Sequence, residues 1–284
     1  MALEISMVGL VLLAAILHAT WNALIKSSGE RMVAFGVITM GGSLLALTAT
    51  FFVDFPNPES WGYIAASVIV HYLYFAFLLL SYRVGDLSHV YPISRGIAPL
   101  LVALGGYVFV GETLSFASIV GICIASLGIM SLAFERGLPR GDNLQPVVFA
   151  LGTGFFIACY TVIDGAGVRL AGDRLGYIFW MFSFEGLPFV IWMIFWPGRG
   201  RDVLNFIKRK PLFAFGGSLF SITAYGLVIF AMSAGTMAHV SALRETSTIL
   251  AAIIGVVILK ETLGIRRIVA AGFVAAGVIV MNIW

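Results

Sequence analysis

Residues 111–114 read Gly-Glu-Thr-Leu and residues 260–263 read Lys-Glu-Thr-Leu, so one short polar pattern occurs twice, 149 positions apart. An arginine precedes the glutamate by 17 residues in both copies, Arg95 in the first and Arg244 in the second. A glycine follows the glutamate by 16 residues in both copies, and almost everything between these landmarks is apolar. The repetition predicts a duplicated membrane segment that carries an arginine inside an apolar run.

The composition is that of a membrane protein. The 284 residues are 60% hydrophobic and 11% charged, and the mean hydropathy is +1.02. Because a water-soluble domain carries roughly 25% charged residues, this chain has too little polar surface to cover itself in water. The net charge of +3 is small and dispersed, and it gives no reason to expect a nucleic-acid partner. The N-terminal apolar run lacks the basic flank and the cleavage signature of a secretory signal, and we interpret it as a first membrane helix.

Ten apolar stretches remain when the sequence is cut at charged residues, Pro and Gly. Each is near the roughly 20 residues that cross the hydrocarbon core as a helix, and a helix satisfies its own backbone in lipid. The stretches are 5–25, 32–53, 61–82, 88–110, 116–134, 146–163, 175–197, 211–234, 238–259 and 268–283. We therefore expect an all-α integral membrane protein with ten transmembrane helices.

The duplication divides the ten stretches into two repeats of five helices, residues 1–137 and 146–284, joined by a connecting loop at 138–145. An odd number of helices in each repeat makes the second repeat enter the membrane in the opposite orientation. Inverted repeats of this kind are typical of secondary transporters, which bind substrate in a central cavity where the repeats meet. A duplicated helical scaffold without transport activity is the alternative.

Lysine and arginine are distributed unequally between the predicted loops. The odd-numbered loops carry thirteen of these residues, and the even-numbered loops carry two, Arg169 and Arg174. Because basic residues are enriched in cytoplasmic loops, this bias places the odd-numbered loops in the cytoplasm and both termini outside.

Four formally charged residues lie inside the apolar stretches: Arg95, Glu185, Arg244 and Glu245. A charge at the centre of the bilayer costs roughly 2.5–3.5 kcal/mol on insertion scales, and such residues usually face a cavity or an ionic partner. Four of them together predict a polar interior.

Arg95 is the first candidate for substrate binding. Tyr91 lies one helical turn before it on the same face, and the guanidinium could hold a carboxylate or a phosphate through two hydrogen bonds. Alternatively, Arg95 pairs with Glu185 and locks the repeats together. Arg244 and Glu245 are further candidates, with a structural ion pair as the alternative role of Arg244. Adjacent helical residues point about 100° apart, so these two need not pair with each other.

The walls of the predicted site combine apolar rings with polar tips, which suits a substrate with an apolar body and a polar head. The residues expected there are Trp21, Asn22, His71, Tyr74 and Tyr160. Each alone could instead form a helix–helix hydrogen bond or anchor a helix at the membrane interface.

Two carboxyl groups are candidates for proton coupling. Glu185 lies near the middle of its apolar stretch among aromatic residues, and Asp164 lies at one end of the stretch 146–163. A carboxyl group inside a membrane protein can bind and release a proton during transport. Glu185 could instead be the permanent partner of an arginine.

Glu112 and Glu261 are interpreted as structural turn residues. Each precedes a threonine that could begin the next helix, with the glutamate binding free backbone N–H groups near the positive end of that helix. Small residues spaced four apart would let the last helix of each repeat approach a neighbour closely. They are Gly121, Ala125, Gly272 and Ala276.

Sequence motifs of an enzyme are absent. No metal-binding His-Glu-x-x-His motif, paired-cysteine motif, phosphate-binding glycine loop or nucleophile elbow is found. We therefore expect neither an enzyme activity nor a cofactor or metal.

The chain resembles the drug/metabolite transporter superfamily, and within it the EamA-like ten-helix transporters. The resemblance rests on two sets of five stretches, on the Glu-Thr-Leu turn after the fourth and ninth, and on the segment Ala19-Thr20-Trp21-Asn22. It implies a basket-like fold whose central cavity is formed by stretches one, three, four, six, eight and nine. It also implies export or exchange of small metabolites by alternating access. Members of the family are usually drawn with both termini in the cytoplasm, opposite to the orientation that the loop charges predict.

We therefore expect a secondary transporter, an exporter or exchanger, of a small polar metabolite such as an amino acid or another zwitterion or anion. Its expected partners are this substrate, the lipid bilayer and a coupling proton. Its expected location is a bacterial inner membrane, which it crosses several times as a monomer or homodimer. Two alternatives remain: a flippase for a lipid-linked head group, and an accessory membrane subunit that transports nothing.

Overall fold

The computed structural model describes residues 4–84, 87–134, 144–257 and 264–283, and within these ranges all regular structure is helical. The helices of the first predicted repeat are α1 (Ile5–Ser27), α2 (Arg31–Ala49), η1 (Thr50–Phe52), η2 (Pro58–Ser60), α3 (Trp61–Val84), α4 (Leu87–Gly105), the π-helical η3 (Gly106–Val110), α5 (Phe116–Ser131) and η4 (Leu132–Phe134). Those that follow are α6 (Gln145–Leu170), α7 (Arg174–Glu185), α8 (Leu187–Phe195), α9 (Arg199–Arg209), α10 (Pro211–Met232), α11 (Met237–Arg244), α12 (Ser247–Val257) and α13 (Ile265–Ile283).

Helix occupies most of each predicted apolar stretch within the described ranges. In the part of the chain that the structure describes, seven helical stretches are long and apolar enough to cross a membrane on length and composition. Many of their large apolar side chains are exposed at the surface of the bundle, as expected where lipid is the solvent. The all-helical membrane class that the sequence predicts is confirmed.

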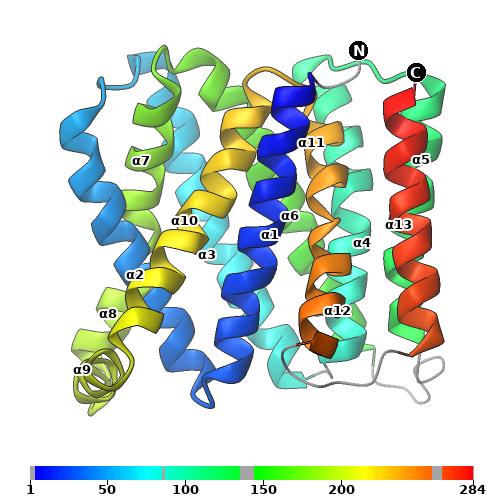
Figure 1. Ribbon diagram of the computed structural model, residues 1–284. Helices are drawn as coiled ribbons and strands as arrows, with labels where there is room; N and C mark the ends of the chain where they lie inside the picture. The colour runs from blue at the N-terminus through cyan, green and yellow to red at the C-terminus, as the bar shows by residue number, and fades with distance from the viewer. Residues whose placement is uncertain (1–3, 85–86, 135–143, 258–263, 284) are drawn as a thin grey trace.

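The helices form one bundle with both ends of the chain on the same side (Figure 1). The neighbours α5 and α13 stand together at one edge of the bundle, and α2 packs against α7 at the other. Between these edges, α1 packs along α10 and α3 packs along α6. The short helix α9 lies at the side opposite the termini (Figure 1).

The predicted stretch 175–197 is interrupted where α7 gives way to α8. The break falls at Gly186, directly after Glu185. The Ser43 hydroxyl accepts the Gly186 N–H at 2.7 Å and donates to a carbonyl of the last turn of α7 at 2.7 Å. The Tyr72 hydroxyl donates to another carbonyl of that turn at 2.6 Å. These contacts from the first repeat supply the hydrogen bonds that a broken helix cannot make for itself in lipid.

The predicted stretch 238–259 is likewise interrupted, between α11 and α12 at Glu245 and Thr246. The Thr246 hydroxyl donates to the Leu243 carbonyl at 2.8 Å, and the Thr248 hydroxyl donates to the Glu245 carbonyl at 2.7 Å. Local threonine bonds of this kind satisfy carbonyl groups that lose their helical partners. Both breaks therefore place a glutamate where the backbone leaves regular helix.

Two further expectations are corrected. Asp164 does not lie at a helix end, because α6 continues to Leu170 and buries the Asp164 side chain completely. The stretch 198–210, expected to be a polar loop, contains the helix α9. Its apolar residues Val203 and Phe206 recur at helical spacing and pack against α2 and α10, which explains why so polar a segment is helical.

The α5–α13 contact differs in register from the prediction. A methyl group at Gly121 would approach the Gly277 carbonyl oxygen to 2.5 Å, so the two backbones lie in direct contact. Gly272 and Ala276 lie on an exposed face of α13, and a methyl group at Gly272 would meet nothing within 4 Å. The prediction for Gly121 agrees with this contact, and the one for Gly272 and Ala276 is wrong because the facing stripe of α13 is shifted by one residue.

Candidate functional site

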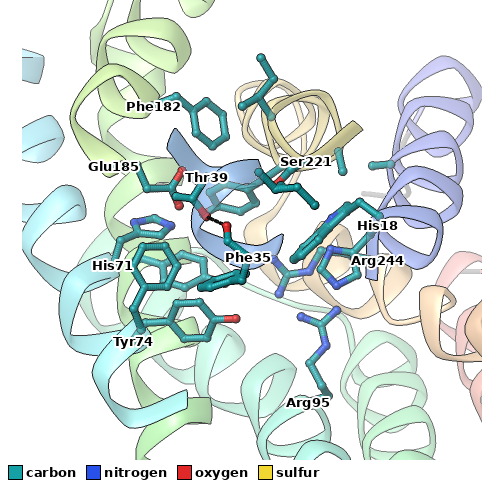
Figure 2. A pocket seen from close by; sticks show the side chains of 18 residues that line it. His18, Phe35, Thr39, His71, Tyr74, Arg95, Phe182, Glu185, Ser221 and Arg244 are labelled. Atoms are coloured by element: carbon teal, nitrogen blue, oxygen red, sulfur yellow. Dashed lines mark hydrogen bonds between the residues drawn. The ribbon is translucent and has the colours of Figure 1, made fainter. Parts of the chain in front are cut away.

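A cavity of about 80 Å³ lies inside the bundle and is lined by side chains of α1, α2, α3, α4, α6, α7, α10 and α11. Both predicted repeats therefore contribute to it. Figure 2 shows Arg95, Arg244 and His18 on one side of the cavity and Glu185, His71 and Tyr74 on the other. The volume has room for several water molecules, because one water needs roughly 10–15 Å³ on this measure.

The cationic end of the cavity is defined here as Arg95, Arg244 and Glu245, and it links helices of the two predicted repeats. The Arg95 Nε lies 3.0 Å from the Glu245 Oε2, and the Arg244 Nη2 lies 3.6 Å from the Glu245 Oε1. Arg95 Nη2 also donates to the Ser247 hydroxyl at 3.5 Å. All three charged side chains are at least 94% buried. One carboxylate thus serves two guanidinium groups.

These contacts decide between the alternatives left open by the sequence. The carboxylate partner of Arg95 is Glu245 and not Glu185. Arg244 and Glu245 also lie within ion-pair distance of each other at the end of α11, which agrees with the structural ion pair considered for Arg244.

The helix break favours this order of charges. Arg244 is the last residue of α11, where the helix dipole favours a cation, and Glu245 precedes α12, where the dipole favours an anion. Because these dipole ends are fixed by the backbone, they stabilise the two charges without water.

Stacked rings form the wall opposite the arginines. The His71 ring lies over the Tyr160 ring with centroids 4.1 Å apart, and Tyr74 and Tyr225 meet the Tyr160 ring edge-on at 5.5 and 5.3 Å. The His71 Nδ1 is bonded within its own helix to the Ser67 carbonyl at 2.9 Å. The wall therefore presents apolar faces with a few polar tips, as the sequence predicts for this site.

Trp21 completes the arginine side of the cavity. Its ring stacks at 6.5 Å on Phe35 and meets the His18 ring edge-on at 5.3 Å. The Trp21 Nε1–H is buried and has no hydrogen-bond partner within the described residues. An unpartnered donor that borders a cavity is available to a ligand.

Glu185 lines the cavity, and no ion pair joins it to another residue in the described part of the chain. Asp164 lies behind the wall and accepts hydrogen bonds from the Tyr177 hydroxyl at 3.0 Å and the Tyr225 hydroxyl at 2.7 Å. Because Tyr225 also lines the cavity, it connects Asp164 to that space. The two candidates for proton coupling thus differ: Glu185 faces the cavity directly, and Asp164 is reached through a tyrosine.

Some predicted residues do not line the cavity. Asn22 donates to the His18 carbonyl of its own helix at 2.8 Å. Tyr91 lies against Arg95, with the guanidinium carbon 5.9 Å from the ring centroid. Glu245 does not line the cavity and contacts it only through its ion pairs with Arg95 and Arg244.

Lining residues that the sequence reasoning missed come mainly from α2 and α10. They are Phe35, Ile38, Thr39, Phe75, Phe182, Ser221, Ile222 and Tyr225. Ser221 and Tyr225 are spaced by one helical turn, a polar stripe that could have been found on an otherwise apolar stretch. The α2 residues carried no such signal.

Glu112 links helices of the two predicted repeats. Its carboxylate accepts the Met237 N–H at 2.9 Å, at the start of α11, and pairs with Arg169. Arg169 also donates to the carbonyls of Met232 and Gly235 at 3.0 and 2.8 Å. We name this group the Glu112–Arg169 clasp.

The clasp differs from the predicted turn in detail. The helix whose positive end Glu112 binds is α11, in the second predicted repeat, and not α5. Helix α5 begins instead after Ser115, whose hydroxyl accepts the Ser118 N–H at 3.1 Å. The equivalent Glu261 lies outside the described residues.

Within the described ranges, no group of three or more His, Cys, Asp or Glu side chains is placed to hold a metal ion.

A multi-pass helical bundle around a charged cavity that both halves line is the arrangement expected of a membrane transporter. A sequence model of the EamA-like transporter family matches residues 144–283. The second half of the chain is therefore an EamA-like domain of the drug/metabolite transporter superfamily, and the resemblance inferred from the sequence is confirmed. Proteins of this family are membrane transporters and not enzymes.

The fold is also similar to a solved crystal structure that shares 16% sequence identity with this chain. The similarity has a TM-score of 0.72 and covers 98% of this chain and 96% of the other. At this identity it shows the fold alone. A comparison with curated proteins found no match.

Proposed function

We propose that the protein is a secondary transporter that exports or exchanges a small polar metabolite, an amino acid or another zwitterion or anion, by alternating access. The observation that carries this proposal is the pair Arg95 and Arg244, which share the single carboxylate of Glu245 at one end of the cavity. Glu185 lies at the other side. An anionic group and a cationic group of one substrate would therefore have complementary partners.

Two inverted repeats with ten membrane-crossing helices are the architecture that we propose for this transport. Helix packing supports it, because α1 lies along α10 as α6 lies along α3, and α12 packs against α1 as α4 packs against α6. Exchanging the repeats converts each of these contacts into its counterpart. The proposed repeat boundaries are those inferred from the sequence, and the proposed location is a bacterial inner membrane.

The proposed cycle alternates the side on which the repeats are in contact. The Glu112–Arg169 clasp ties the turn before α5 to the turn before α11. Opening the cavity toward this side would require the clasp to separate. Substrate would bind between the arginines and Glu185 and favour an intermediate form closed on both sides, with Glu185 or Asp164 exchanging the coupling proton.

The substrate role of Arg95 can be tested by transport into proteoliposomes. A thermal-shift screen of the purified protein against amino acids, organic acids, phosphonates and amines first identifies a ligand, which raises stability by mass action. Replacement of Arg95 by alanine (Arg95→Ala) should then abolish uptake of that ligand. The remaining pair of Arg244 and Glu245 has no excess positive charge with which to bind an anionic group.

The matched control is Arg199→Ala, which removes a partly exposed arginine on α9, outside the cavity, and should transport normally. Uptake that survives in Arg95→Ala at normal expression would contradict the proposal. Activity on lipid vesicles but not on soluble solutes would instead indicate a flippase. Co-purification with a partner and no transport would indicate an accessory subunit.

A further inference from the structure

We propose that Glu245 sets the charge of the transported substrate. The cationic end carries one more positive than negative group, so it accepts a singly charged anionic head, and loss of the Glu245 charge shifts its preference to doubly charged heads. This inference rests on the proposed function, because it specifies the substrate class of the same cavity.

The charge count follows from the geometry. Arg95 and Arg244 are both within 3.6 Å of Glu245, and all three side chains are almost completely buried. Each guanidinium group contributes one formal positive charge, and the Glu245 carboxylate contributes one formal negative charge. The end therefore holds two positive charges and one negative charge, all buried away from bulk solvent. One further negative charge makes it neutral.

Hydrogen-bond donors also remain free. The Arg244 Nε is buried without a hydrogen-bond partner in the described residues, as is the Trp21 Nε1. Both side chains line the cavity, whereas Glu245 does not. Since buried donors are normally satisfied, these two atoms mark where the oxygen atoms of an anionic head would bind.

A second negative charge on the substrate would be unfavourable in the wild-type protein. At the cationic end it would remain without a counter-charge, and a buried unpaired charge is strongly destabilising. Toward the opposite side it would approach Glu185, which has no ion-pair partner within the described part of the chain. The other carboxyl group near this side, Asp164, is also acidic, and its oxygens already accept hydrogen bonds from Tyr177 and Tyr225.

Two probes that differ in charge but hardly in shape test the proposal: 2-aminoethanesulfonate, with a singly charged tetrahedral head, and 2-aminoethylphosphonate, whose head is mostly doubly charged at pH 8. Binding to the purified full-length protein is measured by calorimetry for both. Wild-type protein should prefer the sulfonate. Glu245→Gln should raise the phosphonate-to-sulfonate affinity ratio about tenfold or more, the effect of one close buried charge.

A second variant separates charge from folding. Arg244→Gln alone makes the cationic end neutral and should weaken binding of both probes. Arg244→Gln combined with Glu245→Gln leaves Arg95 as one excess positive charge, so this double variant should regain the preference for the sulfonate. A purely structural role of Glu245 predicts no such rescue. This double variant also decides the question if Glu245→Gln alone does not fold.

The outcomes distinguish the two proposals. If the wild type binds but the ratio is unchanged in Glu245→Gln, or is not restored in the double variant, Glu245 does not set the charge and the transporter proposal stands. If neither probe nor any anion of the thermal-shift screen binds the wild type, the anion site itself is refuted, and this inference with it.

Discussion

At the scale of single residues, the arginines were recognisable from their chemistry alone. A guanidinium inside an apolar run must have a partner, so Arg95 and Arg244 were predicted at the site before any contact was known. Their partner was not predictable. Glu185 and Glu245 were both available in the sequence, and a distance of 3.0 Å between side chains on different helices selects Glu245.

Glu185 gives a prediction at the same scale. It lines the cavity without an ion-pair partner in the described residues, so it is free to exchange a proton with that space. Glu185→Gln cannot carry a proton. It should therefore keep exchange of substrate between compartments at equal pH and lose accumulation driven by a pH gradient, as measured in proteoliposomes. Accumulation that persists would exclude Glu185 as the coupling group, and Asp164→Asn would then test the second candidate.

At the scale of elements, the positions of the helices could be predicted from the lengths of the apolar stretches. The two interruptions, between α7 and α8 and between α11 and α12, could not. The breaks at Gly186 and at Glu245 lie inside stretches that are continuous in hydropathy. They are possible because Ser43, Tyr72 and nearby threonines satisfy the freed backbone groups. The partners at the Gly186 break, Ser43 and Tyr72, are distant from it in sequence, so no local pattern predicts them.

The contact between α5 and α13 gives a prediction at this scale. Gly121→Ala places a methyl group 2.5 Å from the Gly277 carbonyl oxygen, so the helices must move apart. We expect a loss of about 1–3 kcal/mol of stability, seen as a lower midpoint of thermal unfolding in detergent. Gly272→Ala is the matched control, because its methyl group meets nothing within 4 Å and should leave the midpoint unchanged or slightly higher. Equal midpoints for the two variants would contradict this packing.

At the scale of the whole molecule, both ends of the chain lie on one side and the basic helix α9 lies on the other (Figure 1). This arrangement agrees with an even number of crossings. The unequal loop charges predict that the side on which α9 lies is the cytoplasmic one.

The orientation is tested by fusing a reporter after Trp284. A phosphatase that is active only outside the cytoplasm should be active in this fusion, because the loop charges place both termini outside. A fusion in the loop 138–145 should be inactive and serves as the control. The reverse pattern would show that the chain has the orientation usually drawn for its family and that the charge bias misleads.

The membrane class, the helical stretches, the doubled pattern and the charged residues could all be derived from the sequence, because apolar length and the cost of a buried charge are properties of residues in order. The shared carboxylate, the clasp from Glu112 to α11 and the ring wall of His71 and Tyr160 became known only from the folded structure. Each of these joins side chains far apart in sequence. Their distance in space depends on how ten separate stretches pack, which no local spacing specifies.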